Sequence, residues 1–329
     1  MGKSSVDGNG CDMKIGYFLS CEEWGPRDLV AQAAKAEAAG FEGLWISDHY
    51  HPWNDAQGHS PFVWSVIGAI AHATERMTVT TAVTCPTVRI HPAIIAQAAA
   101  TAAVMLDGRF VLGVGSGEAL NEHILGDHWP EADERLEMLE EAVDVIRTLW
   151  EDGVHDYRGR HYRVEHARVY DRPEIPPPIV ISAFGEKAID LAAKIGDGYC
   201  TVAPDADSVE RFRSGAKRGT LVQGGMKVCF GADEAKARAT VHRLWPNEGL
   251  PGELAQVLPT PEHFEQASQL VTEEMVAEAV PCGPDLDRHV EKIREYERAG
   301  FAELHVNQIG PEQDAFFEVY REEVLPRVR

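Results

Sequence analysis

The stretch KIGYFLSCEEWGPRDLVAQAAKAEAAGFEGLWIS, residues 14–47, predicts one complete strand–helix–strand unit. Short runs of β-branched and aromatic residues at 14–20 and 43–47 are typical of strands buried on both faces. Between them lies an alanine-rich segment that starts at Pro26 and stops at Gly40, residues that favour a helix start and a helix end. Two such strands joined by a helix predict a parallel pair in an α/β fold.

The same alternation continues to the end of the chain. Strand-like runs lie at 14–20, 43–47, 77–84, 109–115, 178–184, 197–203, 225–232 and 302–310. Helical segments are expected at 26–40, 61–74, 92–105, 133–153, 186–195, 205–216, 233–244, 260–280, 285–299 and 312–325. These strand-then-helix units predict a (β/α)8 TIM barrel with insertions. The alternative is a doubly wound parallel sheet, which also alternates strands and helices.

Two segments interrupt the alternation. Residues 154–170 alternate polar and apolar side chains around a central Arg-Gly pair, which predicts a surface hairpin. Residues 245–284 contain WPNEGLPGELAQVLPTP and then an extra helix, and we expect them to lie over the barrel mouth. We therefore expect a single barrel domain over 13–329, preceded by a flexible tail, 1–12, that lacks the apolar core of a secretory signal.

The composition indicates a folded protein that binds neither nucleic acid nor membranes. Of the 329 residues, 44% are hydrophobic, which is too many for a disordered chain. The 31 basic and 53 acidic side chains give a net charge of −22, which disfavours phosphate backbones and anionic lipid surfaces. No apolar run approaches the roughly 18 residues of a membrane span. The six cysteines form no CxxC pair, so we expect reduced thiols in a cytoplasmic protein.

Active sites of such barrels lie at the carboxyl ends of the strands. The segment SDHYHPW, residues 47–53, follows the second expected strand and brings together an acid, an imidazole and an indole. An imidazole exchanges protons near neutral pH, a neighbouring carboxylate can orient it, and Trp53 can cover a planar ligand. The alternative is a loop histidine that only makes structural contacts. Histidines 49, 51 and 59 also suggest a metal, but their spacing alone is a weak indication and we expect none.

The segment GVGSGEALNE, residues 113–122, follows the fourth expected strand. It lacks the G-x-G-x-x-G spacing of a dinucleotide fold, although its glycines would allow close approach of a ligand to the backbone. A partly desolvated Glu118 could carry a proton near neutral pH. The alternative is structural, with Ser116 capping a helix and Glu118 favouring its dipole.

The segment FGEKA, residues 184–188, begins another expected helix after a strand. Helix N-termini bind phosphate groups well, so this turn is a candidate phosphate site. A cap without a ligand is the alternative.

Three segments together, SDHYHPW (47–53), TVRIHPAIIAQA (87–98) and VGSGEALNE (114–122), give the chain a clear family resemblance. From 14 to 327 it resembles the bacterial luciferase-like superfamily, in the branch that uses the deazaflavin coenzyme F420. Within that branch it is most similar to F420-dependent glucose-6-phosphate dehydrogenases. The resemblance implies a luciferase-like TIM barrel and F420 as the cofactor.

The resemblance also implies roles for individual residues. His49 would be the active-site histidine and Glu118 the catalytic acid. Trp53 would line the substrate side, and Glu22 would be a further active-site acid. The resemblance leaves open which of His49 and Glu118 is the base. A non-proline cis peptide behind the deazaflavin would fall at Ala82-Val83. The remaining cofactor contacts implied are Asp48, Cys85, Ser116, Gly117, Asn121, Phe184, Gly185, Lys187 and Ala188. Cys85 stands where the family has a threonine.

The chain departs from the family where the sugar phosphate would bind. The family uses a threonine, two lysines and an arginine. Thr201 matches the threonine, but the cations fall on Pro204 or Asp205, near Ala255 and near Ala279. Without them a phosphate dianion loses its charge-assisted hydrogen bonds, so we expect a substrate other than glucose 6-phosphate.

The sequence therefore predicts an F420-dependent dehydrogenase that transfers a hydride between a hydroxyl-bearing carbon of an alcohol or sugar and C5 of the deazaflavin. An aromatic set, Trp24, Trp53, Trp64 and Trp129, favours an uncharged small molecule. The alternatives are an FMN-dependent luciferase-like monooxygenase and a non-catalytic F420-binding protein. By analogy with the family we expect a homodimer.

Overall fold

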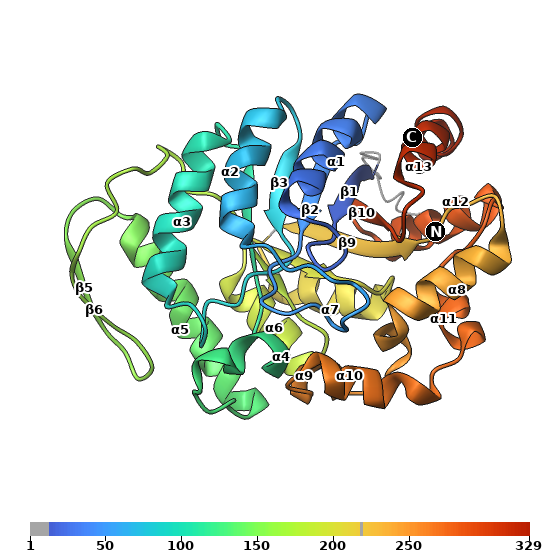
Figure 1. Cartoon of the computed structure of the whole chain (residues 1–329). Coiled ribbons are helices and arrows are strands. Elements are labelled where there is room, and N and C mark those ends of the chain that lie inside the picture. Colours follow the sequence, from blue (N-terminus) through green and yellow to red (C-terminus); the bar gives the residue numbers. More distant parts are fainter. Residues whose placement is uncertain (1–12, 218–219) are drawn as a thin grey trace, which may run out of the picture.

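Eight parallel strands close into a barrel in the computed structural model, which describes residues 13–217 and 220–329 (Figure 1). The strands are β1 (Lys14–Leu19), β2 (Gly43–Ile46), β3 (Thr78–Thr81), β4 (Phe110–Val114), β7 (Ile179–Ser182), β8 (Gly198–Thr201), β9 (Leu221–Val228) and β10 (Glu303–Gln308). Their order is β1-β10-β9-β8-β7-β4-β3-β2, and β1 pairs with both β2 and β10. This closure confirms the predicted TIM barrel and excludes the open doubly wound sheet. The expected tail, 1–12, lies outside the described residues.

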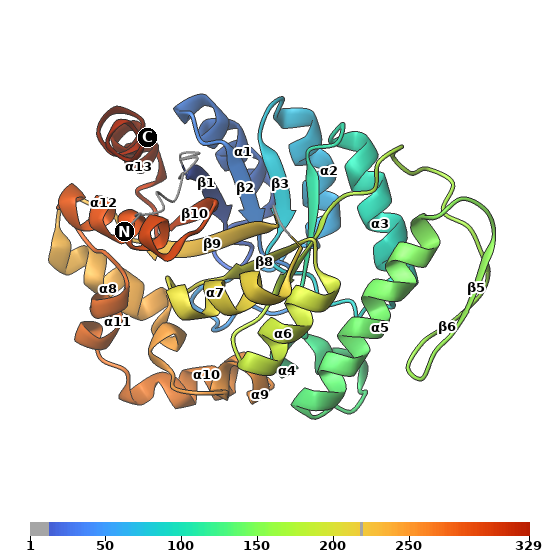
Figure 2. The ribbon, with the colours of Figure 1, turned by 180° about the vertical axis from the view of Figure 1, so that it is seen from behind.

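Helices surround the strands on the outside, as the opposite view also shows (Figure 2). They are α1 (Pro26–Ala39), α2 (Val63–Ala73), α3 (Pro92–Met105), α5 (Ala132–Trp150), α6 (Glu186–Ile195), α7 (Ala206–Gly215), α8 (Glu234–Leu244), α12 (Leu286–Ala299) and α13 (Gln313–Val319). A π-turn (Tyr320–Val324) and α14 (Leu325–Val328) end the chain. Within the described ranges, no helix combines the length and hydrophobicity that a bilayer crossing requires.

Aromatic and polar side chains fill the inside of the barrel. The Trp45 ring stacks on His305 with centroids 4.9 Å apart, and its Nε1 donates to Gln223 Oε1 at 3.1 Å. Gln223 in turn donates to Glu303 Oε2 at 2.7 Å. Because these side chains come from β2, β9 and β10 and are all buried, they fix which positions of each strand face inward.

The strand predicted at 225–232 begins earlier than expected, at Leu221. The pair Gly224-Gly225 is typical of a turn, but here both glycines lie within β9. A Cβ atom on Gly225 would lie 2.4 Å from the Trp45 ring, and one on Gly224 would lie 2.8 Å from Tyr296. These glycines therefore make room for aromatic rings on both faces of the strand.

Two other expected elements differ in length. The helix predicted over 260–280 is broken into α10 (Pro261–Ala267), a 3-10 turn (Ser268–Leu270) and α11 (Glu273–Ala279). The break follows from Thr272, whose side chain accepts from the Met275 amide and caps a new helix. The third strand, expected to reach residue 84, ends at Thr81.

Both predicted insertions are separate from the barrel wall. Strands β5 (His155–Arg158) and β6 (Arg163–Ala167) form an antiparallel hairpin beyond α5 (Figure 1). The second insertion contains a 3-10 turn (Pro246–Gly249), α9 (Leu254–Val257), α10 and α11. It lies beside the short helix α4 (Ala119–Glu122) and the 3-10 turn after it (His123–Leu125), at the carboxyl ends of the strands. Arg135 of α5 donates to Gln256 of α9 at 3.0 Å and joins the insertion to the barrel.

Close packing between β3 and β4 generates a stability prediction. A Cβ atom on Gly113 would lie 1.9 Å from the Thr81 backbone oxygen, which cannot move without distorting the sheet. We expect Gly113→Ala to lower the unfolding free energy by about 1–3 kcal/mol or more, measured as a lower thermal or urea midpoint. The matched control is Gly185→Ala, whose Cβ would enter open space. Equal midpoints for the two variants would contradict the packing argument.

Candidate active site

The predicted catalytic residues come together at the carboxyl ends of β1, β2 and β4. Nε2 of His49 lies 3.4 Å from Glu22 Oε1 and 3.7 Å from Glu118 Oε1. The Trp53 ring packs edge-on against the imidazole, with centroids 5.0 Å apart. Three loops that are distant in the sequence therefore place an imidazole, two carboxyl groups and an indole side by side.

Glu22 is held rigidly beneath His49. Its Oε2 accepts from the hydroxyl groups of Ser20 at 2.7 Å and Ser47 at 2.8 Å. Ser47 also accepts from the backbone amide of Cys21 at 2.9 Å. The glutamate side chain is only 3% exposed, so these donors replace water around its carboxylate.

Asn121 links the loop of His49 to the loop of Glu118. Its Oδ1 accepts from the backbone amides of Tyr50 at 2.7 Å and His51 at 2.9 Å. Its Nδ2 donates to Glu118 Oε1. One carboxamide therefore fixes both the histidine loop and the carboxyl group that faces it.

The hydrogen bonds of His49 define where its protons can be. Nδ1 lies 3.2 Å from the backbone oxygen of His51, and because a carbonyl oxygen only accepts, this nitrogen carries a hydrogen. Nε2 therefore faces the two carboxyl groups of Glu22 and Glu118. It can donate a proton to either of them or accept one from either of them. The trio is arranged to hold and move a proton.

Trp53 is held in place by the insertion. Its ring packs between His49 and Phe264 of α10, with 5.1 Å between the Trp53 and Phe264 centroids. The next two residues bind the same region: Asn54 Nδ2 donates to the Leu244 oxygen at 2.9 Å, and the Asp55 amide donates to Glu265 at 3.1 Å. Sequence reasoning missed Phe264, because nothing in the local pattern of α10 points to Trp53.

A buried ion network supports the other side of the site. Asp48 accepts from Thr84 at 2.7 Å and from Arg89 Nη2 at 3.0 Å. The backbone amide of Arg89 donates to Glu122 at 2.7 Å. Burial raises the pKa of Glu122 to about 7, while Arg89 opposes that rise. Arg89 and Glu122 were not predicted individually, although both lie in segments that carry the family resemblance.

The backbone forms the surface behind these groups. The peptide between Ala82 and Val83 is cis, at the position that the resemblance implied. A Cβ atom on Gly115 would lie 2.8 Å from the Val83 side chain, and one on Gly117 would lie 2.5 Å from the Cys85 sulfur. Gly117 also has a φ of 77°, which favours glycine. The loop that contains Ser116 therefore packs tightly on the end of β3, and the surface has little side-chain bulk.

The remaining predicted residues lie at the β7–α6 junction and at the end of β8. Phe184 and Gly185 are exposed after β7, and Gly185 is the N-cap of α6, whose first turn includes Lys187 and Ala188. The Lys187 ammonium pairs with Asp133 at 2.8 Å. Thr201 is buried at the end of β8.

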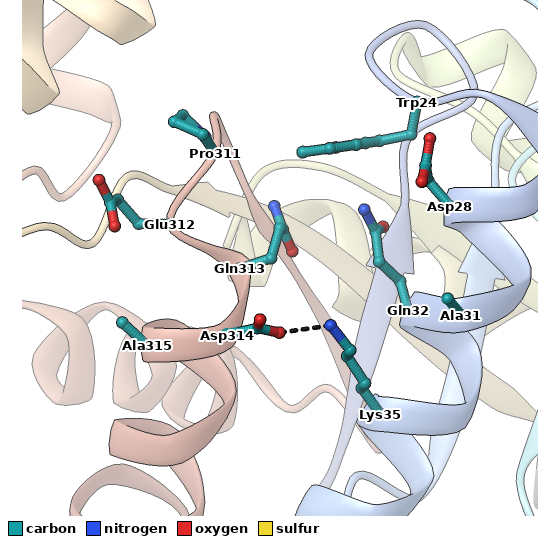
Figure 3. A pocket seen from close by; sticks show the side chains of 10 residues that line it. All are labelled: Trp24, Asp28, Ala31, Gln32, Lys35, Pro311, Glu312, Gln313, Asp314 and Ala315. Carbon is teal, nitrogen blue, oxygen red and sulfur yellow. Dashed lines mark hydrogen bonds and ion pairs between the residues drawn. The ribbon is translucent and has the colours of Figure 1, made fainter.

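Of the four tryptophans in the aromatic set, Trp53 is the one that packs against His49. Trp24 lies over a groove between α1 and α13, where its ring extends toward Pro311 above Gln32 and Gln313 (Figure 3). Trp64, a residue of α2, packs on Phe110 of β4, and Trp129 packs under the Arg135 guanidinium. The aromatic set therefore contributes one side chain to the site.

Comparison with known proteins identifies relatives of the whole chain. Residues 13–303 match the family described as Luciferase-like monooxygenase. An F420-dependent glucose-6-phosphate dehydrogenase of Nakamurella multipartita is 38% identical, with 96% of this chain and 97% of that protein aligned. The corresponding protein of Mycobacterium avium is 33% identical over 97% of this chain and 98% of its own length. These matches confirm the resemblance that the sequence motifs predicted.

Solved structures agree with the fold. An F420-dependent secondary alcohol dehydrogenase in complex with an F420-acetone adduct superposes with a TM-score of 0.90 and 29% identity, covering 97% of this chain and 99% of that one. The FMN complex of the oxygenating constituent of 3,6-diketocamphane monooxygenase from Pseudomonas putida gives a TM-score of 0.69 at 16% identity, covering 96% of this chain and 98% of that one. The second match shows the shared fold alone.

Glu23 is a buried carboxyl that the sequence analysis did not single out. Its Oε1 accepts from Trp245 Nε1, and its Oε2 accepts from the Gly310 amide at 3.0 Å. Burial raises the pKa of Glu23 to about 7, although these two hydrogen bonds work against the rise. The glutamate joins the end of β1 to the end of β10 and to the insertion.

The raised pKa of Glu23 predicts how stability depends on pH. Between about pH 4.5 and pH 7 the folded state binds this proton and the unfolded state releases it, so stability falls as the pH rises. One such group changes the unfolding free energy by up to about 1.4 kcal/mol per pH unit. We expect Glu23→Gln to flatten the decline of unfolding free energy across this range, measured by urea unfolding at a series of pH values. An unchanged slope would contradict the raised pKa.

Proposed function

The chain belongs to the luciferase-like monooxygenase family, and from this membership and the site geometry we propose that it is an F420-dependent oxidoreductase acting on alcohols. The observation that carries the proposal is His49, placed between Glu22 and Glu118 and against Trp53. Relatives named for F420 cover nearly the whole chain and support the cofactor.

The residues present fit a flat tricyclic ring. The cis peptide at Ala82-Val83 and the glycine loop at 115–117 give a surface of low bulk, and Asp48 and Asn121 lie at its edge. The N-terminus of α6, reached through Gly185, would hold the phosphate of the cofactor tail. When bound, the deazaflavin supplies a hydride acceptor at C5, chemistry that no side chain provides.

The side chains of this chain would handle the protons and the positioning. Nε2 of His49 would accept the proton of the substrate hydroxyl group, which lets the carbon that bears this oxygen give up its hydride to the bound deazaflavin and become a carbonyl carbon. Glu22, fixed by two serines, stabilises the imidazolium that forms. Glu118, on the other side of His49, would be the group that exchanges a proton with the cofactor, and Trp53 would keep the substrate in place for the transfer.

The substrate is an alcohol or sugar that carries no phosphate. The positions of the family's phosphate-binding cations fall on Pro204 or Asp205 after β8, near Ala255 in α9 and near Ala279 at the end of α11. None of these side chains can form a charge-assisted hydrogen bond to a phosphate. Thr201 remains the candidate hydroxyl contact from β8.

Replacing His49 tests the mechanism. We expect His49→Ala to lower alcohol turnover by about a hundredfold or more, the size typical of a lost general base, while F420 still binds. Turnover follows the absorbance of F420, and binding follows its fluorescence. The matched control is His128→Ala, an exposed histidine, which should keep full activity.

Three results would overturn this proposal. Normal turnover by His49→Ala would reject the base, and Glu118→Gln would then identify the other candidate. Oxygen uptake with reduced FMN would indicate a monooxygenase. Binding of F420 without turnover of any alcohol would indicate a non-catalytic binding protein.

We also infer a homodimer in a reducing compartment such as the cytoplasm. The described cysteines, Cys21, Cys85, Cys200, Cys229 and Cys282, are free thiols, which suits a reducing environment. An apolar groove between α2 and α3 exposes 56% of Phe62, 57% of Ile94 and 50% of Met105. A contiguous exposed apolar face of this kind supports a protein interface.

A charge placed on this face tests the dimer. We expect the wild-type chain to elute as a dimer and Ile94→Glu to elute as a monomer in size-exclusion chromatography with light scattering, because a carboxylate would be buried without a partner. Ile175→Glu is the control, since that side chain is 81% exposed elsewhere. A monomeric wild type, or a dimeric Ile94→Glu variant, would contradict the inference.

A further inference from the structure

A lysine faces the barrel mouth from β9. Inward-facing positions alternate along this strand, and Gln223 contacts Trp45 inside the barrel. Two and four residues later, Gly225 and Lys227 face the same way, with Lys227 near the carboxyl end. Lys227 is paired in register with Asn307 of β10, which is also buried.

The insertion neutralises this lysine. The Lys227 ammonium lies 2.9 Å from Glu248 Oε1 and 4.4 Å above the centroid of the Trp245 ring. The lysine side chain is 12% exposed and the glutamate side chain 28% exposed, so water screens the pair only in part. Both partners come from the segment that follows α8, outside the barrel wall.

The pair lies on the Trp53 side of the site. Trp245, which lies under Lys227, donates to Glu23, the neighbour of Glu22 in the sequence. Trp53 packs against the same apolar cluster that contains Trp245. Glu23 also attracts Lys227 electrostatically, but its two carboxyl oxygens accept from Trp245 and from the Gly310 amide, and the direct ion pair of Lys227 is with Glu248.

We propose that Glu248 determines the charge of the substrate, by cancelling the positive charge of Lys227 at the mouth of the barrel. A lysine without this partner would attract an anionic group of a substrate; the paired lysine presents no net positive charge there, which favours uncharged alcohols. This inference rests on the proposed function and deepens it by naming a residue that sets the substrate class.

Asn307 supports an uncharged, hydroxyl-bearing substrate. Its Nδ2 donates to the Phe18 oxygen at 2.9 Å, whereas its buried Oδ1 has no donor among the residues that the structure describes. An unpaired buried acceptor is costly, and a hydroxyl group of a ligand would satisfy it. Lys227 and Asn307 are paired in register on neighbouring strands. Lys227 would offer a substrate a donor whose charge is already paired, and Asn307 would offer an unpaired acceptor oxygen.

The test compares an anionic and a neutral alcohol in one set of variants. In Glu248→Gln loaded with F420, we expect kcat/KM for glucose 6-phosphate to rise about tenfold or more relative to 2-propanol and glucose, the gain expected from one charge-assisted hydrogen bond. Glu262→Gln, the same charge change at an exposed position of α10, should leave the ratio unchanged. The double variant Glu248→Gln, Lys227→Met should lose the gain.

A binding measurement without the cofactor separates this inference from the proposed function. Calorimetric titration of glucose 6-phosphate into the chain without F420 should show tighter binding by Glu248→Gln than by wild type, and no gain in the double variant. If Glu248→Gln unfolds early, Glu248→Leu serves as the second variant. Unchanged affinity and unchanged selectivity would overturn the role of Glu248, whereas failure of the wild type to bind F420 would overturn the proposed function instead.

Discussion

Closure of the barrel through the pairing of β1 with β10 is the contact on which the site depends. The register of this pair, Lys14 with Glu303 to Tyr17 with Val306, brings the first and last strands of the chain side by side. Because all eight strands are parallel, their carboxyl ends then lie on one rim. Loops that begin after Leu19, Ile46 and Val114 meet there without having to be long, and each can be fixed by contacts to its neighbours.

The site is rigid because its polar side chains are bonded to one another as well as to the backbone. Glu22 accepts from two serines, and Asn121 accepts from two amides and donates to Glu118. Each of these groups is buried, so a missing partner would cost free energy, and each loop therefore has one favourable arrangement. The imidazole of His49 is thereby positioned between two carboxyl groups before any ligand arrives, which is the condition for proton transfer at a defined atom.

Strand periodicity was sufficient to predict the barrel. Local motifs and the family resemblance were sufficient to predict that His49, Trp53, Glu22 and Glu118 lie in one cluster. The sequence was insufficient for contacts between distant segments. The bond from the Asp55 amide to Glu265 spans 210 residues, and the edge-on contact of Trp53 with Phe264 lies in the same region. No local pattern specifies which helix of an insertion will face which loop. The early start of β9 at Leu221 has a related cause, since the aromatic rings that require Gly224 and Gly225 come from other strands and helices.

The insertion contacts both the catalytic cluster around His49 and the lysine that we propose to affect substrate charge. It packs Phe264 against Trp53, and it places Trp245 and Glu248 around Lys227. The end of a barrel strand can carry a cation such as Lys227. A segment outside the barrel wall can either form an ion pair with that cation or leave it unpaired, and neither arrangement changes the closed sheet. Substrate charge can therefore change through the insertion while the proton-transfer geometry built on β1, β2 and β4 stays fixed. In the proposed function, the loss of the phosphate-binding cations and the pairing of Lys227 with Glu248 act in the same direction, because both disfavour an anionic substrate.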